Sequence, residues 1–274
     1  MMPSHGAFSP FYVPFSRPRR GLTALLTMIG LLTGVGTAQA QDARAILLKT
    51  LKAYQALNTY SGEATVAMTI RPQQGTAFTG KSSSAMTFQR PNKIHIRLAS
   101  THSSRNIYSD GANLSVYEVA TNQYHTVPMA SRQGDLLALL AGEGVNSNLD
   151  PLYFLVGKGL PQDLTNIQLK EAAAYLGGQP VYIITGTTHT PANKSKSSPT
   201  ITLGATSSWT WWIDRRSFLI YQVETRTPNS VVRFFKGTLT IRHSVVKVQS
   251  NPVIPASEFV FTPPPNAVRK QPTP

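Results

Sequence analysis

The residues of this chain that could carry out chemistry are scattered along it. The histidines beyond residue 40 show no His-x-x-x-His or His-Glu spacing that would hold a metal ion; they are His95, His102, His125, His189 and His243. Ser103, Ser104 and the other serines lack a Gly-x-Ser-x-Gly turn, no glycine-rich phosphate loop opens a helix, and the 12 acids are isolated. The sequence therefore predicts a protein that is not an enzyme and has no metal and no cofactor. We expect His95 to point to solvent from a strand.

Aromatic residues are concentrated instead in one stretch, Ser208–Thr227, with the sequence SWTWWIDRRSFLIYQVETRT. The stretch predicts two strands joined by a turn over residues 214–217. This turn would place Ile213 opposite Phe218, because side chains alternate along a strand. Both faces of the ribbon would then be largely apolar, whereas a ribbon with one solvent-exposed face alternates apolar and polar residues. Each face therefore needs a cover.

Eight aromatic residues are candidates for the wall of a hydrophobic ligand cavity: Trp209, Trp211, Trp212, Phe218, Tyr221, Phe88, Tyr117 and Phe154. Each could equally fill the core between a sheet and its helices. The argument for a ligand is that one long helix and two short ones must cover both sides of a large sheet, while a helix shields a strip only about 10 Å wide. Part of one face should therefore stay open or hold an apolar molecule.

The first 40 residues have the three parts of a secretory signal peptide. Arg17, Arg19 and Arg20 precede an apolar run from Gly21 to Val35, and Ala38-Gln39-Ala40 is a small-x-small cleavage site. A membrane anchor is the alternative, but the run is shorter than the roughly 20 residues that a membrane span needs. We therefore expect cleavage after Ala40 and export to the periplasm, by the general or the twin-arginine route.

The chain is strongly basic, with 26 lysines and arginines against 12 acids and a net charge of +14 over 274 residues. Cleavage would leave 234 residues with a net charge of about +11, enough for one domain with a sizeable core. The bases are dispersed and no nucleic-acid motif is present, so we expect no nucleic acid as partner. The positive charge is suited to binding an anionic membrane surface or an anionic lipid. Alternatively, it could serve only to keep the protein soluble. The chain has no cysteine, so the exported fold must be stable without disulfides. We also expect the protein to be a monomer.

Apolar periodicity predicts an N-terminal helix followed by a long antiparallel meander. The helix begins at Asp42 and ends near Leu57, with one wide apolar stripe that needs a sheet to lie on. A two-residue hairpin turn is predicted at Asp110-Gly111. Besides the aromatic ribbon, the predicted strands and hairpins cover residues 61–70, 84–88, 94–98, 106–119, 123–127, 166–175, 181–187, 231–235 and 238–248.

Two short helices, a long loop and a last strand complete the prediction. Residues 135–141 are followed by Gly142, and residues 150–157 begin with Asp150-Pro151 and end with a glycine, as short helices do. These helices either plug one end of the sheet or form a lid. Residues 188–205 predict a long mobile loop, and residues 256–267 predict a final strand closed by prolines.

Short motifs accompany this order of segments: Trp212-Ile213-Asp214 with Ser217, Phe259 and Phe261 with Pro263-Pro264 and Ala267, and Asp110-Gly111 with Tyr117. Together they resemble the superfamily of periplasmic lipoprotein carriers, outer-membrane acceptors, mycobacterial lipid-binding lipoproteins and stress-sensor domains. The resemblance is closest to an uncharacterised branch of predicted periplasmic proteins and covers nearly all of the mature chain. Its motifs are structural and specify fold better than activity.

The resemblance implies a mainly β (α+β) fold: an unclosed antiparallel β half-barrel of about eleven strands around short helices, as a single domain over residues 41–274. It implies a carrier, receptor or sensor whose concave face binds an acyl chain of a lipid or lipoprotein, for example during transport across the periplasm. The carriers hold an arginine on an early strand facing the cavity; Arg71 and Arg97 are the nearest basic residues, but neither lies in a matching motif. The alternative is a periplasmic sensor or protein-interaction module without a bound lipid.

Overall fold

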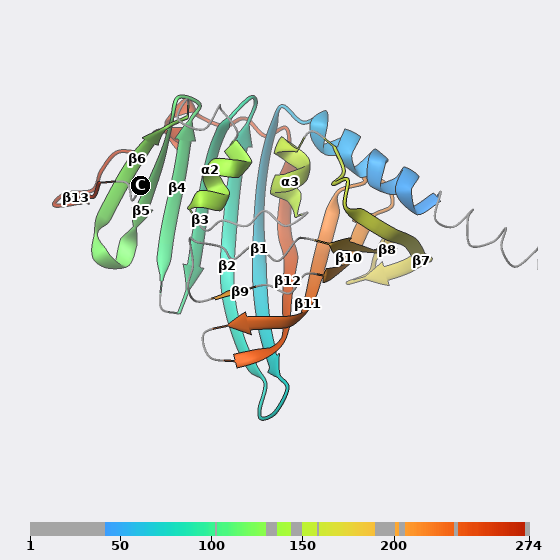
Figure 1. Cartoon of the computed structure of the whole chain (residues 1–274). Helices are drawn as coiled ribbons and strands as arrows, with labels where there is room; N and C mark the ends of the chain where they lie inside the picture. The colour runs from blue at the N-terminus through green and yellow to red at the C-terminus, as the bar shows by residue number, and fades with distance from the viewer. Residues whose placement is uncertain are drawn as a thin grey trace, which may run out of the picture. The chain divides into compact units, whose positions relative to one another are not determined.

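One large curved β-sheet is the frame of the protein (Figure 1). The computed structural model describes residues 42–101, 103–129, 136–143, 150–157, 159–189, 201–202, 206–232 and 235–271. The strands within them are β1 (Thr59–Pro72), β2 (Phe78–Gln89), β3 (Lys93–Ser100), β4 (Ser104–Asp110), β5 (Asn113–Glu118), β6 (Gln123–Pro128), β7 (Leu164–Leu176), β8 (Gln179–His189), β9 (Ile201–Thr202), β10 (Thr206–Asp214), β11 (Ile220–Val232), β12 (Phe235–Ser250) and β13 (Val268–Arg269). The expected signal peptide lies outside the described residues, as does most of the expected loop at 188–205.

The described strands form a single unclosed sheet. Their order is β13-β6-β5-β4-β3-β2-β1-β12-β11-β10-β8-β7, with β9 paired to β11, and the two ends do not join. All pairs are antiparallel except β13 with β6. Since β9 and β13 have two residues each, eleven strands of six residues or more remain. The predicted unclosed half-barrel of about eleven antiparallel strands is confirmed.

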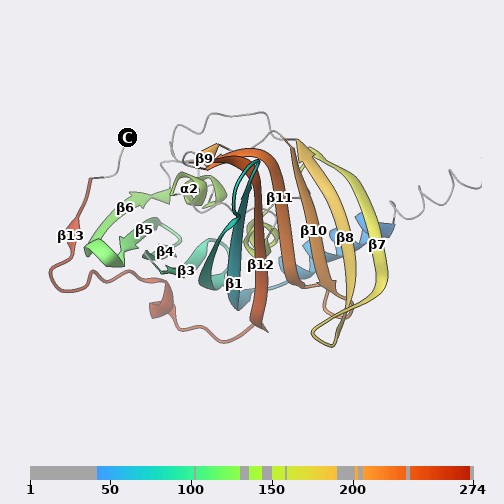
Figure 2. The same cartoon turned by 90° about the horizontal axis from the view of Figure 1, so that it is seen from below.

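The helices lie in the hollow of this curved sheet (Figure 2). They are the N-terminal helix (residues 42–55, blue in Figure 1), α2 (Leu136–Gly142) and α3 (Pro151–Val156), with the short 3-10 helices η1 (Val119–Thr121) and η3 (Ala256–Phe259) elsewhere. The Asp150 carboxylate caps α3 by accepting a hydrogen bond from Tyr153 N at 3.3 Å, as its sequence predicts. Among the described residues we find no helix with the length and apolar character needed to cross a membrane.

The core fills the space between the concave face and these helices. One cluster joins the N-terminal helix and α3 to the sheet; its most buried members are Ala43, Leu47, Tyr54, Phe88, Phe154, Leu155, Ile184, Trp211 and Ile213. A second cluster joins α2 to the other part of the sheet and includes Ile94, Ile107, Leu114, Val116, Leu136, Leu140 and Leu152. Because strand side chains alternate, the same strands turn their polar residues to the convex face.

Arg90, directly after β2, ties the N-terminal helix and α3 to the sheet. Its Nε donates a hydrogen bond to Leu57 O at 2.8 Å, and its Nη2 donates to Tyr54 O and Leu155 O at 3.2 Å. These carbonyls lie at or just beyond the C-terminal ends of the N-terminal helix and α3, where backbone oxygens lack partners within the helix and carry partial negative charge. The Arg90 side chain also packs on the Phe88 ring, 5.6 Å from its centre. One cation therefore satisfies two helix ends at once.

Replacing Arg90 by methionine should lower the free energy of unfolding by about 3 kcal/mol, since three partly buried carbonyls lose a charged donor. Urea denaturation measures this change. Arg226→Met, at an exposed position on β11, is the control and should change stability by less than about 0.5 kcal/mol. Equal effects of the two substitutions would contradict the role of Arg90.

The turn of the aromatic ribbon is longer than predicted. Ile213 pairs with Ile220 and not with Phe218, so the turn covers residues 214–219. The Asp214 carboxylate caps it by accepting hydrogen bonds from Ser217 N at 2.6 Å and Ser217 Oγ at 2.7 Å. Phe218 then adopts a left-handed backbone with φ of 58°, which adds two residues before the chain re-enters the sheet. The predicted register of this ribbon was therefore wrong.

The hairpin of β4 and β5 forms where predicted, but its turn is not a two-residue turn. The last pair is Ser109 with Leu114, which leaves residues 110–113 in the turn. Asp110 Oδ1 accepts hydrogen bonds from Ala112 N at 2.8 Å and Asn113 N at 2.7 Å. The side chain of Asp110 closes the turn in place of a tight backbone pair.

The C-terminal segment is not the predicted strand. Residues 256–259 form η3, and the chain then runs irregularly along the outside of the sheet to β13 (Figure 2). The three prolines at 263–265 have no N–H to donate to a ladder. The segment is held by its aromatic rings instead: the Phe261 ring lies 5.4, 6.0 and 5.2 Å from those of Tyr108, Tyr117 and Tyr124.

His95 is buried beneath this segment, so the prediction that it points to solvent was wrong. Only 7% of the residue is exposed, its Nδ1 lies 2.9 Å from Glu258 Oε1, and its ring stacks on Tyr108 at 4.1 Å. Burial lowers the pKa of His95, although the Glu258 carboxylate opposes this by favouring the charged ring. The folded chain therefore resists protonation of His95.

Acidification should destabilise the fold through His95. Below about pH 6.5 the unfolded chain takes up a proton that the folded His95 resists, so the free energy of unfolding falls with pH. We expect the loss of thermal stability between pH 7 and pH 5 to be smaller in His95→Gln than in the wild type. His189→Gln, at an exposed position, should keep the wild-type loss. An unchanged loss in His95→Gln would count against this contribution.

Candidate functional site

A small polar cluster lies among apolar side chains on the concave face. Its members are Ser84 on β2, His243 on β12 and Asp150 before α3. Ser84 Oγ lies 3.4 Å from His243 Nε2, although β1 separates their strands. The β1 residues that pair with them are Ala64 beside Ser84 and Val66 beside His243. The short side chain of Ala64 leaves room for the serine and the imidazole to meet across the strand.

Burial opposes the charged forms of this cluster. It raises the pKa of the Asp150 carboxyl and lowers the pKa of the His243 imidazole, while the attraction between the two opposes both shifts. Burial, and secondarily the charge of Asp150, also raises the pKa of the Tyr60 hydroxyl. His243 Nδ1 is buried and has no hydrogen-bond partner among the described residues. A buried ring nitrogen without a partner is costly, so the cluster has an unused capacity to bind a polar atom.

Apolar side chains surround this cluster and are only half-buried. We call them the concave strip: Val66, Met68, Met86, Leu98 and Ile241. The strand register places Val66 beside His243, Leu98 beside Ser84 and Met68 beside Ile241. In Figure 1 the strands β1, β2 and β12 run on well past α2 and α3. The concave strip thus continues the apolar core beyond α2 and α3 toward the buried pair Ile70 and Leu239, against which Met68 and Ile241 pack.

Four of the eight aromatic candidates lie in the core beside this strip. Trp211, Phe88 and Phe154 are completely buried, and Trp209 is 5% exposed. The Trp209 and Trp211 rings stack with centres 6.0 Å apart, and Trp209 Nε1 donates a hydrogen bond to Thr188 Oγ1 at 2.9 Å. These side chains pack between the sheet and its helices. Their contact with a ligand stays a prediction.

The other four candidates lie elsewhere. Trp212 is half-buried on the convex face, because it alternates with Trp211, and Tyr117 lies against Phe261 of the C-terminal segment. Phe218 stacks on Tyr182 at the ribbon turn, with ring centres 6.2 Å apart, and Tyr221 hydrogen bonds to Asp214. The eight residues therefore do not line one wall. Contact of these four side chains with a ligand also stays a prediction.

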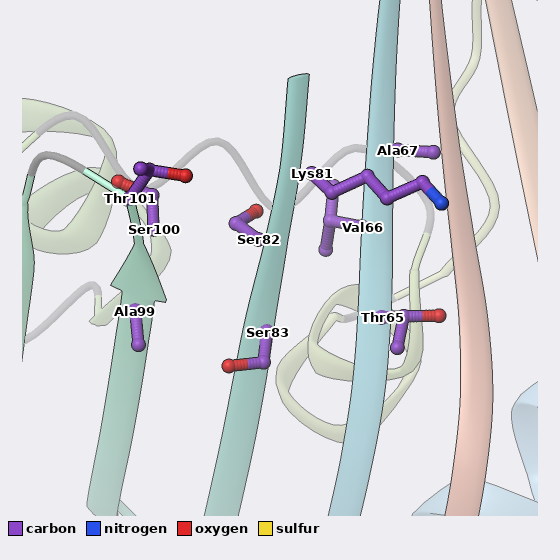
Figure 3. A pocket seen from close by; sticks show the side chains of 9 residues that line it. All are labelled: Thr65, Val66, Ala67, Lys81, Ser82, Ser83, Ala99, Ser100 and Thr101. Atoms are coloured by element: carbon purple, nitrogen blue, oxygen red, sulfur yellow. The ribbon is translucent and has the colours of Figure 1, made fainter. Parts of the chain in front are cut away.

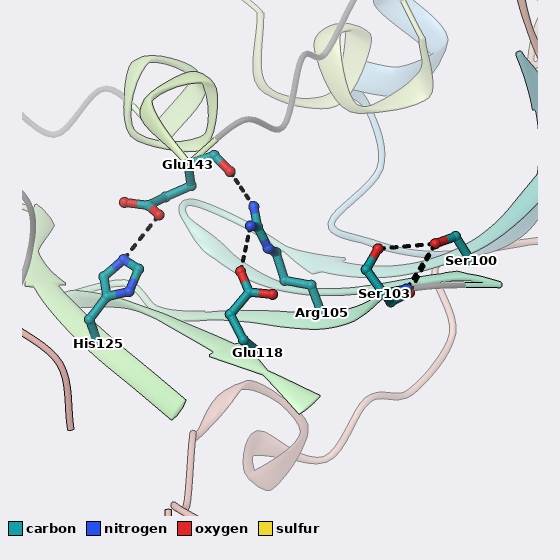
Figure 4. A network of polar contacts seen from close by, with 6 residues as sticks. All are labelled: Ser100, Ser103, Arg105, Glu118, His125 and Glu143. Carbon is teal, nitrogen blue, oxygen red and sulfur yellow. Dashed lines mark hydrogen bonds and ion pairs between the residues drawn. The ribbon is translucent and has the colours of Figure 1, made fainter. Parts of the chain in front are cut away.

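A polar network ties the end of α2 to three strands (Figure 4). Arg105 on β4 donates a hydrogen bond to the backbone oxygen of Glu143 at 2.5 Å and pairs with the Glu118 carboxylate on β5. His125 Nε2 on β6 lies 3.0 Å from Glu143 Oε2. Arg105 pairs with Leu98 in the ladder and so faces the concave side, whereas Arg71 and Arg97 are exposed on the convex side. The network fixes α2 over its part of the concave face.

Two hollows lie on the convex face, on the side of the sheet opposite the polar cluster. They measure about 540 and 360 Å³ and adjoin each other, since Thr65, Ser83 and Ala99 line both. Figure 3 shows the larger one, where hydroxyl groups, methyl groups and Lys81 form the lining. Both hollows are lined mainly by small side chains and are open to solvent, so a hydrocarbon chain in them would stay largely exposed to water.

The polar cluster could not be predicted from sequence patterns. Ser84 and His243 are 159 residues apart along the chain and no motif links them. Asp150 was predicted as a helix cap, which it is, but its proximity to a histidine depends on where α3 lies on the sheet. Among the described residues, no group of three histidines or acids could hold a metal ion.

The fold and this face allow comparison with known proteins. The family model described as "Predicted periplasmic protein (DUF2092)" matches residues 43–177, from the N-terminal helix to β7. This part of the chain is similar to that family. The resemblance to predicted periplasmic proteins stated from the sequence is therefore confirmed. We found no curated protein that matches the chain.

Several solved structures are distantly similar. LprF from Mycobacterium bovis has 12% identity and a TM-score of 0.45, over 78% of this chain and 96% of its own. An uncharacterized conserved protein from Thermus thermophilus has 10% identity and a TM-score of 0.41, over 84% and 98%. A LolA superfamily protein from Nitrosomonas europaea has 11% identity and a TM-score of 0.29, over 80% and 97%.

Removing the Arg105 side chain should loosen α2 without unfolding the sheet. In Arg105→Met, amide hydrogen exchange over residues 136–142 should speed up by about tenfold, as expected when a charge-assisted hydrogen bond to a helix end is lost. Exchange in β10 and β11, which lie far along the sheet, should stay as in the wild type. Uniformly faster exchange would show instead a loss of global stability, and unchanged exchange in α2 would contradict the role of the network.

Proposed function

We propose that the chain is an exported, non-catalytic binding protein that holds an acyl chain of a lipid or lipoprotein in the concave face, for transport across the periplasm. The observation that carries this proposal is the concave strip: half-buried apolar side chains that extend the core beyond its helices. Covering this surface with hydrocarbon would release water from it at a gain of about 25 cal/mol per Å². A carrier needs such a surface, since its ligand must enter and leave.

Three further features support the proposal. The matched family is described as periplasmic, and the first 40 residues have the pattern of a cleaved signal peptide. The excess of 26 basic over 12 acidic residues suits approach to an anionic membrane surface, from which a lipid could be taken. In this proposal the buried aromatic residues Phe88, Phe154, Trp209 and Trp211 form the rigid core against which the ligand site is built.

Uptake of a fluorescent fatty acid by delipidated, folded protein tests the proposal. The wild type should bind saturably, and Met68→Asp should weaken binding at least tenfold, because a carboxylate in the strip would be buried against the hydrocarbon. Thr65→Asp is the matched control: the residue lies three positions earlier on β1, is exposed on the convex face, and should bind like the wild type. Thermal melting of each variant checks that it is folded, and Met68→Gln serves as a milder second variant.

Absence of saturable uptake by the folded wild type would overturn lipid binding and favour the alternative, a sensor or protein-interaction module. The half-buried Trp212 on the convex face is the observation that would then matter, since exposed tryptophan is typical of protein interfaces. Equal loss of uptake in Met68→Asp and Thr65→Asp would show that the concave strip is not the site.

A further inference from the structure

We propose that Ser84 and His243 form a polar subsite that binds an uncharged oxygen of the lipid, such as an ester carbonyl or a glycerol hydroxyl. This inference rests on the proposed function and adds what the acyl chain is attached to. The subsite lies where the concave strip meets the helix-covered core, so a chain on the strip would bring its polar end to His243.

The geometry leaves one side of the imidazole unused. His243 Nε2 faces Ser84 Oγ at 3.4 Å, and Nδ1 is buried without a partner among the described residues. If the serine hydroxyl donates to Nε2, then Nδ1 carries the proton and needs an acceptor; in the reverse arrangement Nδ1 needs a donor. A carbonyl oxygen satisfies the first arrangement, and a hydroxyl satisfies either. Binding such an oxygen would remove the cost of the orphaned nitrogen.

The charge of the surroundings disfavours a phosphate. Asp150 acts on His243 from the N-terminal side of α3, and the same carboxylate raises the pKa of Tyr54 and Tyr60 beyond the effect of their burial. Burial favours the neutral forms of both Asp150 and His243, so no settled positive charge is available to pair with an anion. If Asp150 is ionised, it repels a phosphate directly. An uncharged oxygen needs no positively charged partner and is not repelled by the Asp150 carboxylate.

Matched lipids with one acyl chain length test the subsite. Wild-type protein should bind a monoacylglycerol about tenfold more tightly than the corresponding lysophosphatidic acid. His243→Leu should weaken monoacylglycerol binding five- to tenfold, as expected for one buried hydrogen bond, and Ser84→Ala about threefold. Both variants should bind an alkane of the same length like the wild type, since the alkane has no oxygen. Ser82→Ala, on the same strand and face but without contact to His243, is the control.

A measurement on the wild type avoids dependence on variants that fold poorly. Adding monoacylglycerol should shift the imidazole ¹⁵N resonance of His243 Nδ1, whereas the alkane should not. The subsite is overturned if this resonance does not respond to bound monoacylglycerol, if His243→Leu keeps the wild-type preference, or if the phosphate lipid binds more tightly. In those cases the alkane still binds and the proposed function stands. If neither the alkane nor the glyceride binds the wild type, both proposals fail.

Discussion

The contact on which the rest of this structure depends is that of the Arg90 guanidinium with the ends of two helices. A curved sheet with an apolar concave face is not stable in water until something covers that face. The N-terminal helix and α3 supply the cover, but each helix leaves backbone carbonyls without partners where it ends. Arg90 satisfies carbonyls from both segments with one side chain that also packs on Phe88. The position of α3 on the concave face, and with it the polar cluster, follows from this anchoring.

The limited size of the helical cover explains the rest of the concave face. The helices and the buried aromatic residues complete the core beneath them, and the long strands β1, β2 and β12 continue past them. Val66, Met68 and Ile241 are therefore only half-buried. At the border of the covered region, Ser84, His243 and Asp150 introduce polar atoms into apolar surroundings, which is costly unless each atom has a partner. At this border a half-buried apolar surface lies next to His243 Nδ1, which has no hydrogen-bond partner in the described part of the chain.

The convex face is covered in a different way. The aromatic ribbon predicted two apolar faces, and the concave one is covered by helices. On the convex side, over β3 to β6, the protein uses its own C-terminal segment, in which Phe261 packs among three tyrosine rings and Glu258 binds His95. Prolines suit this role because a segment that crosses strands does not need their ladder hydrogen bonds. Trp212 lies outside this cover and stays half-buried.

Local patterns in the sequence determined the secondary structure, because alternation, helix caps and turn residues act within a few positions of each other. The antiparallel meander, the helix over residues 42–55 and the capping of α3 by Asp150 could all be predicted in this way, whereas the half-barrel was implied only by the resemblance to periplasmic carriers. The ribbon register, the course of residues 256–267 and the burial of His95 could not, because a left-handed Phe218 and a distant Glu258 decide them. Only the tertiary structure brings Ser84, Asp150 and His243 together. Three separate segments meet there because the sheet places β2 and β12 on either side of β1, and no pattern along the chain records that neighbourhood.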